Sequence, residues 1–459
     1  MDSRRPPGPR VALELDWSDA RRRAQALKRA QVSYVKNAGP DREPTSAVLR
    51  SSTPMAEAVL NVLDTSVITQ RFEVSFEYPV VFTRHVFAPE NPVLIEALRR
   101  REPDRRHKVL ALIDSGVDQA WPNLRADIAL YAERYAEFVE LAAEPDIVPG
   151  GEGAKSSAVI VGSLQARFSA LRMDRHSVVL IVGGGAVQDA AGFAAATTHR
   201  GIRVVRVPTT VLSQNDSGVG VKNGINAFGA KNFLGSFAPP FAVVNDIAFI
   251  ATLSPRDRIA GMAEAVKVAL IRDRAFFDWL RDRSSALTSF DEEAMATLIR
   301  RSAELHLRHI ATSGDPFETG SARPLDFGHW AAHKLEAMTA HELRHGEAVA
   351  IGMALDARYS VEIGLLGREA FAAIANLLEG LGFRLFHEAL LENGPDGRRV
   401  VLEGLREFRE HLGGDLVITM LAGIGQGVEV REIHEDAMLR ATRWLESRDG
   451  ERMGRITLA

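Results

Sequence analysis

Three side chains in the second half of the sequence could together hold a metal ion: Glu264, His329 and His345. Two imidazoles and one carboxylate, with no obvious fourth protein ligand, are typical of a catalytic zinc that keeps one position open for water or substrate. The chain has no cysteine, so any metal must be held by histidine, aspartate or glutamate. Taken singly, each residue is weak evidence, because a histidine after a glycine at a helix start is more often a cap or a buried structural residue, and the prediction rests on all three together.

Two neighbours of these residues could move or hold charge. His333 follows His329 by four residues, so both would share one helical face. Zinc proteases use this spacing, but they need a glutamate directly after the first histidine, where this chain has Trp330. We therefore interpret His333 as a proton relay beside the metal or as a buried structural histidine. Lys267 shares a helical face with Glu264, and a solvated ion pair is the alternative to a catalytic role.

A second group of residues has the character of a phosphate site. Segment 177–182 is a valine-rich apolar run that predicts a buried parallel strand, and Gly183, Gly184 and Gly185 follow it directly. The alanine-rich segment 186–197 predicts a helix that begins at these glycines. Such a turn binds the pyrophosphate of a dinucleotide, because free N–H groups and the helix dipole attract an anion. The spacing is not G-x-G-x-x-G, so a tight turn without ligand is the alternative.

The segments around this turn also carry polar residues suited to a ligand. An earlier predicted strand, 109–113, ends in Asp114, at the edge of the sheet where α/β proteins bind ligands. A strand over 202–207 runs into a polar, glycine-rich segment, which we predict to be a loop contacting a phosphorylated ligand. Solvated lysines are the alternative. The polar residues in and just before this loop are Arg200, Asp216, Lys222, Asn226, Lys231 and Asn232.

The elements that must position these residues fall into three regions. Residues 1–68, rich in arginine, serine and proline, are predicted to be an extension with one helix at 17–35. Residues 69–253 alternate strands with helices, which predicts a parallel sheet covered on both faces; here 70–83 reads as a strand and 123–141 as one helix. Residues 254–459 are predicted to be helical, beginning with Ser254 as a cap and Pro255 in the first turn.

Composition narrows the class of protein. The 459 residues are 46% hydrophobic and 25% charged, as in ordinary globular proteins. A net charge of −4 gives no basic face for nucleic acid. No apolar run approaches the roughly 18 residues that a membrane span needs, and the start of the chain lacks an apolar signal region. We therefore expect a cytoplasmic enzyme that binds neither membrane nor nucleic acid.

With these segments assembled, the sequence from about 70 to 430 resembles the sugar phosphate cyclases of the dehydroquinate synthase family. The motifs that carry the resemblance are GEGAK, GGGAVQDAAGF, RGIRVVRVPTT, DSGVGVKNGIN followed by GAKN, AEAVK, FGHWAAH and HGEAVAIG. The resemblance implies a Rossmann-like NAD-binding α/β domain at 69–253 and an all-helical metal-binding domain at 254–459. It also implies zinc or cobalt, a site between the two domains, a sugar phosphate substrate and a homodimer.

The resemblance assigns a role to each matching residue. The metal ligands would be Glu264, His329 and His345. The residues implied to contact NAD are Asp114, Gly183, Gly184, Gly185, Asp189, Thr209 and Thr210. The residues implied to be catalytic are Asp216, Lys222, Lys267 and His333. Those implied to bind substrate are Lys155, Arg200, Lys231, Asn232, Arg308, Arg323 and Asp326.

The implied reaction consumes no net NAD. A carbinol is oxidised to a ketone, phosphate leaves by elimination, reduction restores the alcohol, and an intramolecular aldol step closes a carbocycle. The metal polarises an oxygen of the sugar, which is Lewis-acid catalysis. A metal-dependent alcohol dehydrogenase and a noncatalytic scaffold of the same fold are the alternatives; the former would not need the lysines and would accumulate NADH.

Departures from the family pattern bear on the substrate. Dehydroquinate synthases have asparagine at Asp326, lysine where counting places Arg308, and an arginine one residue before Arg323. They also have a lysine near the carboxyl end, where this chain reads REHLGGDL. These changes favour a seven-carbon ketose phosphate without a carboxylate, sedoheptulose 7-phosphate, and a valiolone-type cyclitol of secondary metabolism, with dehydroquinate synthase as the alternative. His333 is nevertheless retained where valiolone synthases depart, so the chain fits neither subgroup cleanly.

Overall fold

The computed structural model describes residues 68–156, 158–228, 230–313, 315–317, 324–411 and 414–457. The predicted helix at 17–35 and the candidate residue Arg323 lie outside the described residues. The chain divides into two compact units, Met1–Val74 and Ser75–Ala459. The described part of the first unit, residues 68–74, contains neither helix nor strand. The domain limits at 68 and 253 stay predictions.

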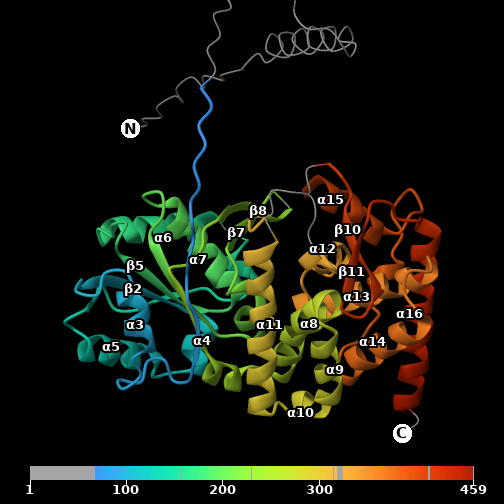
Figure 1. Ribbon diagram of the computed structural model, residues 1–459, viewed down its shortest axis with the longest axis horizontal. Coiled ribbons are helices and arrows are strands. Elements are labelled where there is room, and N and C mark those ends of the chain that lie inside the picture. Colours follow the sequence, from blue (N-terminus) through green and yellow to red (C-terminus); the bar gives the residue numbers. More distant parts are fainter. Residues whose placement is uncertain are drawn as a thin grey trace, which may run out of the picture. The chain divides into compact units, whose positions relative to one another are not determined.

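One sheet organises the first half of this unit. Seven strands pair in parallel among the described residues, as the alternation of apolar runs and helices predicts (Figure 1). The central strand β5 (Val178–Gly183) is buried at every position, which suits its valine-rich sequence. The order is β1 (Val80–Thr83), β9 (Ala242–Asp246), β6 (Arg203–Pro208), β5 (Val178–Gly183), β2 (His107–Asp114) and β3 (Val139–Leu141), with β4 (Asp146–Val148) also paired to β2.

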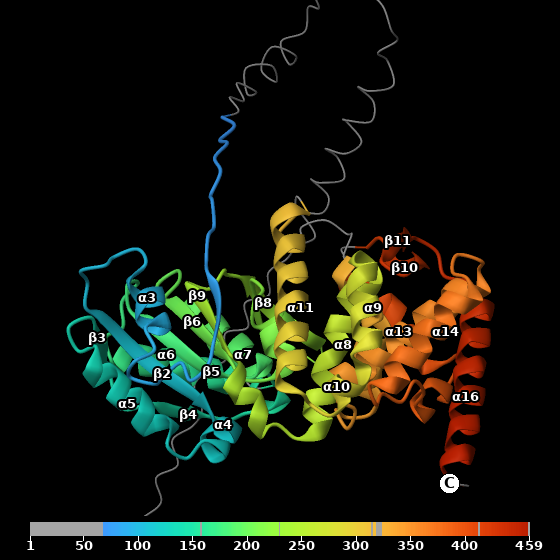
Figure 2. The ribbon, with the colours of Figure 1, turned by 60° about the horizontal axis from the view of Figure 1, so that its bottom comes forward.

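Helices cover both faces of the sheet (Figure 2). Side chains alternate along a strand, and in β2 Val109 and Ala111 enter one core whereas Leu110 and Leu112 enter another. The first core is completed by α3 (Val93–Arg99) and α5 (Leu124–Arg134), and the second by α6 (Ala158–Ala170) and α7 (Gly185–Thr197). The short helix α4 (Ser115–Ala120) follows β2. This confirms the Rossmann-like α/β half.

Two elements of this half differ from the sequence prediction. The predicted helix 123–141 is wrong beyond Arg134, because Val139 and its neighbours pair with β2 as the edge strand β3. The alternating segment 70–83 is a strand only at Val80–Thr83. The polar segment after β6 is also more ordered than a loop. It forms a turn of π-helix, η2 (Ser213–Ser217), and an antiparallel hairpin of β7 (Lys222–Ala227) and β8 (Ala230–Phe237).

The second half is mostly helical and packs around α13, which is buried along most of its length. Ser254 caps α8 by accepting a hydrogen bond from the Asp257 amide at 3.1 Å, as its sequence predicts. The other second-half elements are the short hairpin of β10 (Ile418–Gly423) and β11 (Gln426–Val430), which the sequence analysis did not anticipate, and α8 (Pro255–Arg272), α9 (Arg274–Asp282), α10 (Ser284–Thr288), α11 (Glu292–Thr312), α12 (His329–Met338), α13 (His345–Glu362), α14 (Arg368–Gly380), α15 (Glu403–His411) and α16 (Glu435–Thr457).

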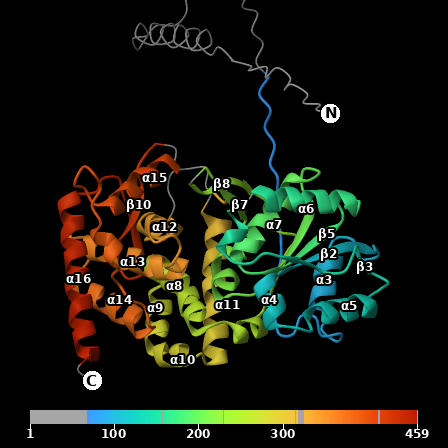
Figure 3. The same cartoon turned by 180° about the vertical axis from the view of Figure 1, so that it is seen from behind.

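The two halves meet along α8, α11 and the hairpin of β7 and β8. Helix α11 contacts η2, and the hairpin contacts α7, so the polar segment after β6 lies between the sheet and the helices. Helix α16 forms the outer edge, whereas α8 and α11 lie beside the α/β half (Figure 1 and Figure 3). Among the described residues, none of the helices has both the length and the apolar character needed to span a lipid bilayer.

Candidate active site

The structure brings Glu264, His329 and His345 together from three helices. Glu264 lies within α8, while His329 and His345 are the first residues of α12 and α13. The Nε2 atoms of both imidazoles lie 3.5 Å from the same oxygen, Oε1 of Glu264. One potential ligand atom from each residue falls within 4.8 Å of the other two. The three side chains therefore converge on one point, the geometry expected of ligands to a single ion.

Close helix packing produces this convergence. A Cβ atom added to Gly346 would lie 1.8 Å from the backbone oxygen of Ala260 on α8, so α13 approaches α8 directly beside His345. A Cβ on Gly352 would lie 2.0 Å from the backbone oxygen of Gly328, which has a φ of +79° and precedes His329. Only glycine permits such contacts between backbones. The position of His345 therefore depends on Gly346, and the position of His329 depends on Gly328 and Gly352.

The donor set fits a divalent cation. Glu264 is 1% exposed, and within the described part of the chain neither of its carboxylate oxygens has a well-formed hydrogen bond. A buried carboxylate is costly unless its charge is compensated, and a cation at the convergence point would compensate Oε1, the oxygen that both imidazoles face. Two imidazole nitrogens and one carboxylate oxygen suit zinc or a similar first-row metal. The role of these residues as ligands remains a proposal.

Lys267 lies against this carboxylate inside the protein. Its ammonium contacts Oε2 of Glu264, and the two side chains are only 4% and 1% exposed, so the interpretation as a solvated pair is wrong. Burial would lower the pKa of Lys267, but Asp216 and Glu264 raise it above its usual value. Burial would raise the pKa of Glu264, but Lys267 and His329 hold it well below its usual range. Both groups are therefore charged.

Glu336 is a member of this cluster that the sequence analysis missed. Its Oε2 lies 3.0 Å from Nδ1 of His345, and its two oxygens lie 2.7 and 2.9 Å from Nζ of Lys231. Burial would raise the pKa of Glu336, but His345 and Lys231 lower it far below the usual range. Glu336 follows His329 by seven residues and His333 by three, so helical spacing on α12 could have identified it.

His333 completes a group of three imidazoles. Its ring centroid lies 5.5 Å from that of His329 and 6.0 Å from that of His345. Burial, and next the charge of Lys231, lower the pKa of His333 well below its usual value. A neutral imidazole in this place can accept or donate a proton, so both interpretations of His333, relay and structural residue, stay predictions.

The glycine turn after β5 has the features of a pyrophosphate site. Gly184 is the N-cap of α7 and provides no side-chain cap, which leaves the first amides of the helix for a ligand. The predicted neighbours surround the turn: Thr209 donates its amide to the Gly183 oxygen at 3.2 Å, and Asp114 lies against Gly183. A Cβ atom on Gly184 would lie 3.3 Å from the methyl group of Thr210.

Lys155 and Asp189, assigned to substrate and cofactor respectively, form a buried ion pair. Nζ of Lys155 lies 2.7 Å from Oδ2 of Asp189. Burial would lower the pKa of Lys155, but Asp189 and then Glu152 raise it. The hairpin is joined to the same place, because the Asn226 amide donates to the Lys155 backbone oxygen at 2.7 Å. Lys155 therefore connects α7 of the glycine turn with the end of β7 in the hairpin. The turn before Lys155, η1 (Glu152–Ala154), is short.

Asp216 contacts a histidine on α11, His306, which was not among the predicted site residues. Oδ1 of Asp216 lies 2.7 Å from Nδ1 of His306. Burial would raise the pKa of Asp216, but the charge of Lys267, with help from His306, lowers it to about 2. Arg308, which was placed by simple counting along the sequence, is exposed and lies about 200° around the helix from His306. Its role in substrate binding stays a prediction.

Three other residues that were predicted to bind substrate or to be catalytic are exposed and lie outside the buried cluster: Arg200, Lys222 and Asn232. Arg200 is exposed in the turn between α7 and β6, at the amino end of the strand, whereas the glycine turn lies at the carboxyl end of β5. Lys222 and Asn232 are exposed on the hairpin, so their roles stay predictions. Asp326 is half-buried in η4 (Pro324–Asp326), and its charge contributes to the raised pKa of Lys267.

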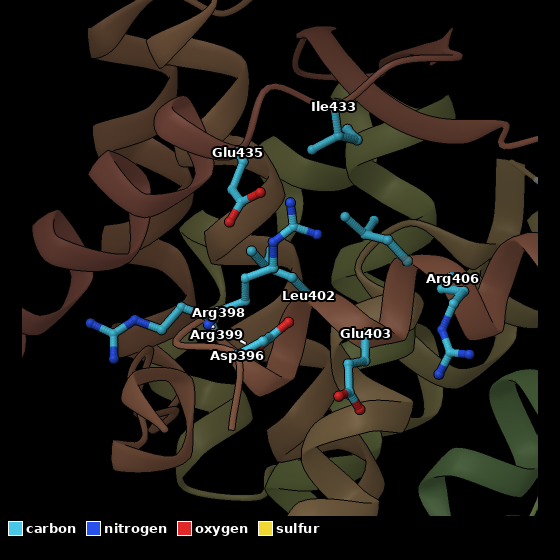
Figure 4. A pocket seen from close by; sticks show the side chains of 9 residues that line it. Asp396, Arg398, Arg399, Leu402, Glu403, Arg406, Ile433 and Glu435 are labelled. Carbon is cyan, nitrogen blue, oxygen red and sulfur yellow. Dashed lines mark hydrogen bonds between the residues drawn. The ribbon is translucent and has the colours of Figure 1, made fainter. Parts of the chain in front are cut away.

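A hollow elsewhere on the helical half does not belong to this cluster. It lies among η6 (Val400–Leu402), α15 and the start of α16, where acidic and basic side chains mix (Figure 4). Its lining contains none of the metal, turn or lysine residues described above. The lining residues are Asp396, Arg398, Arg399, Leu402, Glu403, Leu405, Arg406, Ile433 and Glu435.

Comparisons with known proteins identify the family. Residues 146–260 match a model described as 3-dehydroquinate synthase N-terminal, and residues 261–394 match its C-terminal counterpart. The 2-epi-5-epi-valiolone synthase of Streptomyces glaucescens is 33% identical over 365 residues, which are 78% of this chain and 88% of that protein. This chain belongs to the 3-dehydroquinate synthase family. It is therefore a sugar phosphate cyclase of that family, as the motifs suggested.

Other members of the 3-dehydroquinate synthase family are similarly related. The 3-dehydroquinate synthase of Halorhodospira halophila is 40% identical over 268 residues, covering 58% of this chain and 73% of that protein. The solved 2-epi-5-epi-valiolone synthase of Streptomyces hygroscopicus, with NAD+ and Zn2+ bound, has a TM-score of 0.73 and 29% identity and covers 84% of this chain and all of the other. A 2-deoxy-scyllo-inosose synthase at 24% identity and TM-score 0.63 shares the fold. The family is thus established, and relatives with different names, a 2-epi-5-epi-valiolone synthase and a 3-dehydroquinate synthase, match at 33% and 40% identity.

Asp356 on α13 holds the backbone on either side of His329. Fully buried, it accepts hydrogen bonds from the Gly328 amide at 3.0 Å and from Nε1 of Trp330 at 2.9 Å. Burial raises the pKa of Asp356 to about 7. Because this value exceeds the unfolded-state value of about 3.9, the native protein binds more protons than the unfolded chain between about pH 4 and 7. The contribution of Asp356 to stability therefore falls as pH rises through that window.

Replacing Asp356 with asparagine should remove this pH dependence. The free energy of unfolding of the wild type, relative to Asp356→Asn, should decrease as pH rises from about 5 to 7, by at most about 1.4 kcal/mol per pH unit, and then level off. Urea unfolding of both metal-free proteins across this range measures the difference. A difference that does not change with pH would show that Asp356 ionises normally in the folded protein.

Proposed function

We propose that this protein is an NAD-dependent and divalent-metal-dependent sugar phosphate cyclase. It would eliminate phosphate from a seven-carbon ketose phosphate, with sedoheptulose 7-phosphate as the preferred candidate, and close the product to a carbocyclic cyclitol of the valiolone type. As a phosphate-eliminating lyase it would return NAD unchanged. We also propose a cytoplasmic homodimer that acts in secondary metabolism.

One observation carries the proposal: the short segment η2 touches both halves of the site. A Cβ atom on Gly185 would lie 2.6 Å from Oγ of Ser217, so η2 lies against the glycine turn. Nδ2 of Asn215 donates to the backbone oxygen of Gly261 on α8 at 2.8 Å, one turn before Glu264. Between them, Asp216 interacts electrostatically with Lys267. A cofactor at the turn and a cation at Glu264 would therefore adjoin a common space.

Each half would supply a different part of the chemistry. NAD, held by Gly183 to Gly185, Asp114, Thr209 and Thr210, supplies reversible oxidation of a carbinol, and the cation on Glu264, His329 and His345 supplies Lewis acidity. A cationic Lys267 would attract the phosphate of the sugar, and an anionic Asp216 would accept hydrogen bonds from its hydroxyl groups. The neutral imidazole of His333 would accept or donate a proton beside them. The relatives solved with NAD+ and Zn2+ or Co2+ support this cofactor pair.

The charge around Lys267 supports a substrate without a carboxylate. Asp326 lies near enough to raise the pKa of Lys267, and an ionised carboxylate accepts hydrogen bonds from hydroxyl groups but repels another anion. Lys231 and Lys155 already have carboxylate partners in Glu336 and Asp189. Fewer unpaired cations are therefore offered to a second anionic group on the sugar. The similarity to 3-dehydroquinate synthases makes that activity the second candidate.

A comparison of two substrates tests the proposal. Purified protein with NAD and zinc or cobalt is offered either sedoheptulose 7-phosphate or the heptulosonate phosphate of the shikimate route, and phosphate release is measured. We expect release from sedoheptulose 7-phosphate. Release from the heptulosonate alone would contradict the substrate assignment and favour the second candidate. Accumulation of NADH without phosphate release would indicate an alcohol dehydrogenase instead.

A further inference from the structure

Glu336 connects the proposed metal cluster with the hairpin of the α/β half. One of its oxygens lies 3.0 Å from Nδ1 of His345, and both lie within 2.9 Å of Nζ of Lys231 on β8. Glu336 is 3% exposed, and its two partners, Lys231 and His345, are partly exposed. The sequence analysis assigned no role to Glu336, and the proposed reaction does not use it.

The group formed by His333, Glu336 and His345 has ligand spacing of its own, but it does not describe a second cation site. The ammonium of Lys231 already contacts both oxygens of Glu336. A divalent ion there would lie beside that ammonium, and the two positive charges would repel each other. His345 would also have to serve two ions at once. The contacts instead describe a carboxylate that orients a histidine.

The hydrogen-bond chemistry fixes how His345 is presented. An ionised carboxylate only accepts hydrogen bonds, so Nδ1 of His345 must carry the proton that it shares with Glu336. In the neutral ring that a cation would bind, the lone pair then lies on Nε2, which is the atom 3.5 Å from Oε1 of Glu264. Carboxylates that hold a histidine in this way orient metal ligands in many proteins.

We propose that Glu336 is a positioning residue for the metal: it holds His345 so that Nε2 faces the cation, and Lys231 balances its buried charge. This inference rests on the proposed metal site. It also assigns Lys231 to the support of that site, because its ammonium is already bonded to Glu336. Lys231 would then affect the metal through Glu336 and not as an independent phosphate ligand.

Metal binding to the purified protein, without NAD or substrate, tests this role. We expect Glu336→Gln to weaken zinc binding about 10-fold to 100-fold in a chelator competition, and to change the visible absorption spectrum of the cobalt-loaded protein. The double variant Lys231→Met/Glu336→Gln should behave like Glu336→Gln. Because it leaves no unpaired buried charge, the double variant also serves if the single variant does not fold.

Lys334→Met is the matched control, because Lys334 lies on the same helix and pairs with Glu403 and Glu407 at 2.8 and 2.7 Å. It should bind zinc like the wild type. Folded Glu336 variants with wild-type affinity and an unchanged cobalt spectrum would overturn the inference and leave the proposed function intact. A wild-type protein that binds no zinc or cobalt would overturn the proposed function and this inference together.

Discussion

His345→Ala should lose bound metal and turnover together. The substitution removes one of three side chains that converge on a single point, and a cation held by only Glu264 and His329 would keep too few protein ligands. We expect zinc affinity to fall by more than about 100-fold, beyond the effect of losing an outer partner such as Glu336. Metal content after dialysis and phosphate release in the presence of NAD measure the two losses.

His341→Asn provides the control for this substitution. His341 is an exposed histidine four residues earlier, and asparagine tolerates its positive φ of 64°. The control should keep metal and activity. If His345→Ala retained wild-type metal content while remaining folded, His345 would not be a ligand.

Gly346→Ala should separate the helices that carry the ligands. The new methyl carbon would lie 1.8 Å from the Ala260 oxygen and 2.6 Å from its carbonyl carbon, and backbone atoms cannot move aside as a side chain can. Overpacking commonly costs about 1–3 kcal/mol, and a clash with backbone exceeds that range. We expect a marked fall in melting temperature and a weaker metal site, because α13 must move away from α8.

Gly380→Ala is the matched control for Gly346→Ala. Gly380 ends α14, and a Cβ there would meet no atom within 4 Å. Alanine at this place should be neutral or stabilising by up to about 1 kcal/mol. Thermal unfolding and zinc titration of both variants compare the two positions. Equal behaviour of the two variants would contradict the close approach of α8 and α13.

The sequence predicted correctly those helices, strands and turns that are determined by neighbouring residues in the chain. The valine-rich strand, the three glycines and the alanine-rich helix predicted β5, the turn and α7, because burial and backbone freedom leave marks in composition. Ser254 and Pro255 predicted the start of α8 for the same reason. The prediction of a loop after β6 was wrong, because glycines and polar side chains are equally compatible with a loop and a hairpin.

Contacts between side chains that lie far apart in the sequence could not be predicted from such local patterns. The pairing of Glu336 with Lys231 and of Asp216 with His306 joins residues 105 and 90 positions apart, and nothing in the local sequence of either shows the other. Arg308 was selected by counting along the sequence, and counting does not show that His306, two residues earlier, contacts Asp216. The three candidate metal ligands, which the structure brings together, were selected because the family motifs, and not spacing alone, mark all three.

The position of a bound cation tests the central claim most directly. Crystals grown with cobalt and NAD would give an anomalous peak, and the account predicts one peak bonded to the Glu264 carboxylate and to Nε2 of both His329 and His345. The pyrophosphate of NAD should lie at the turn of Gly183 to Gly185 in the same crystal. A cobalt peak held by other residues, or a cofactor bound away from that turn, would contradict the account.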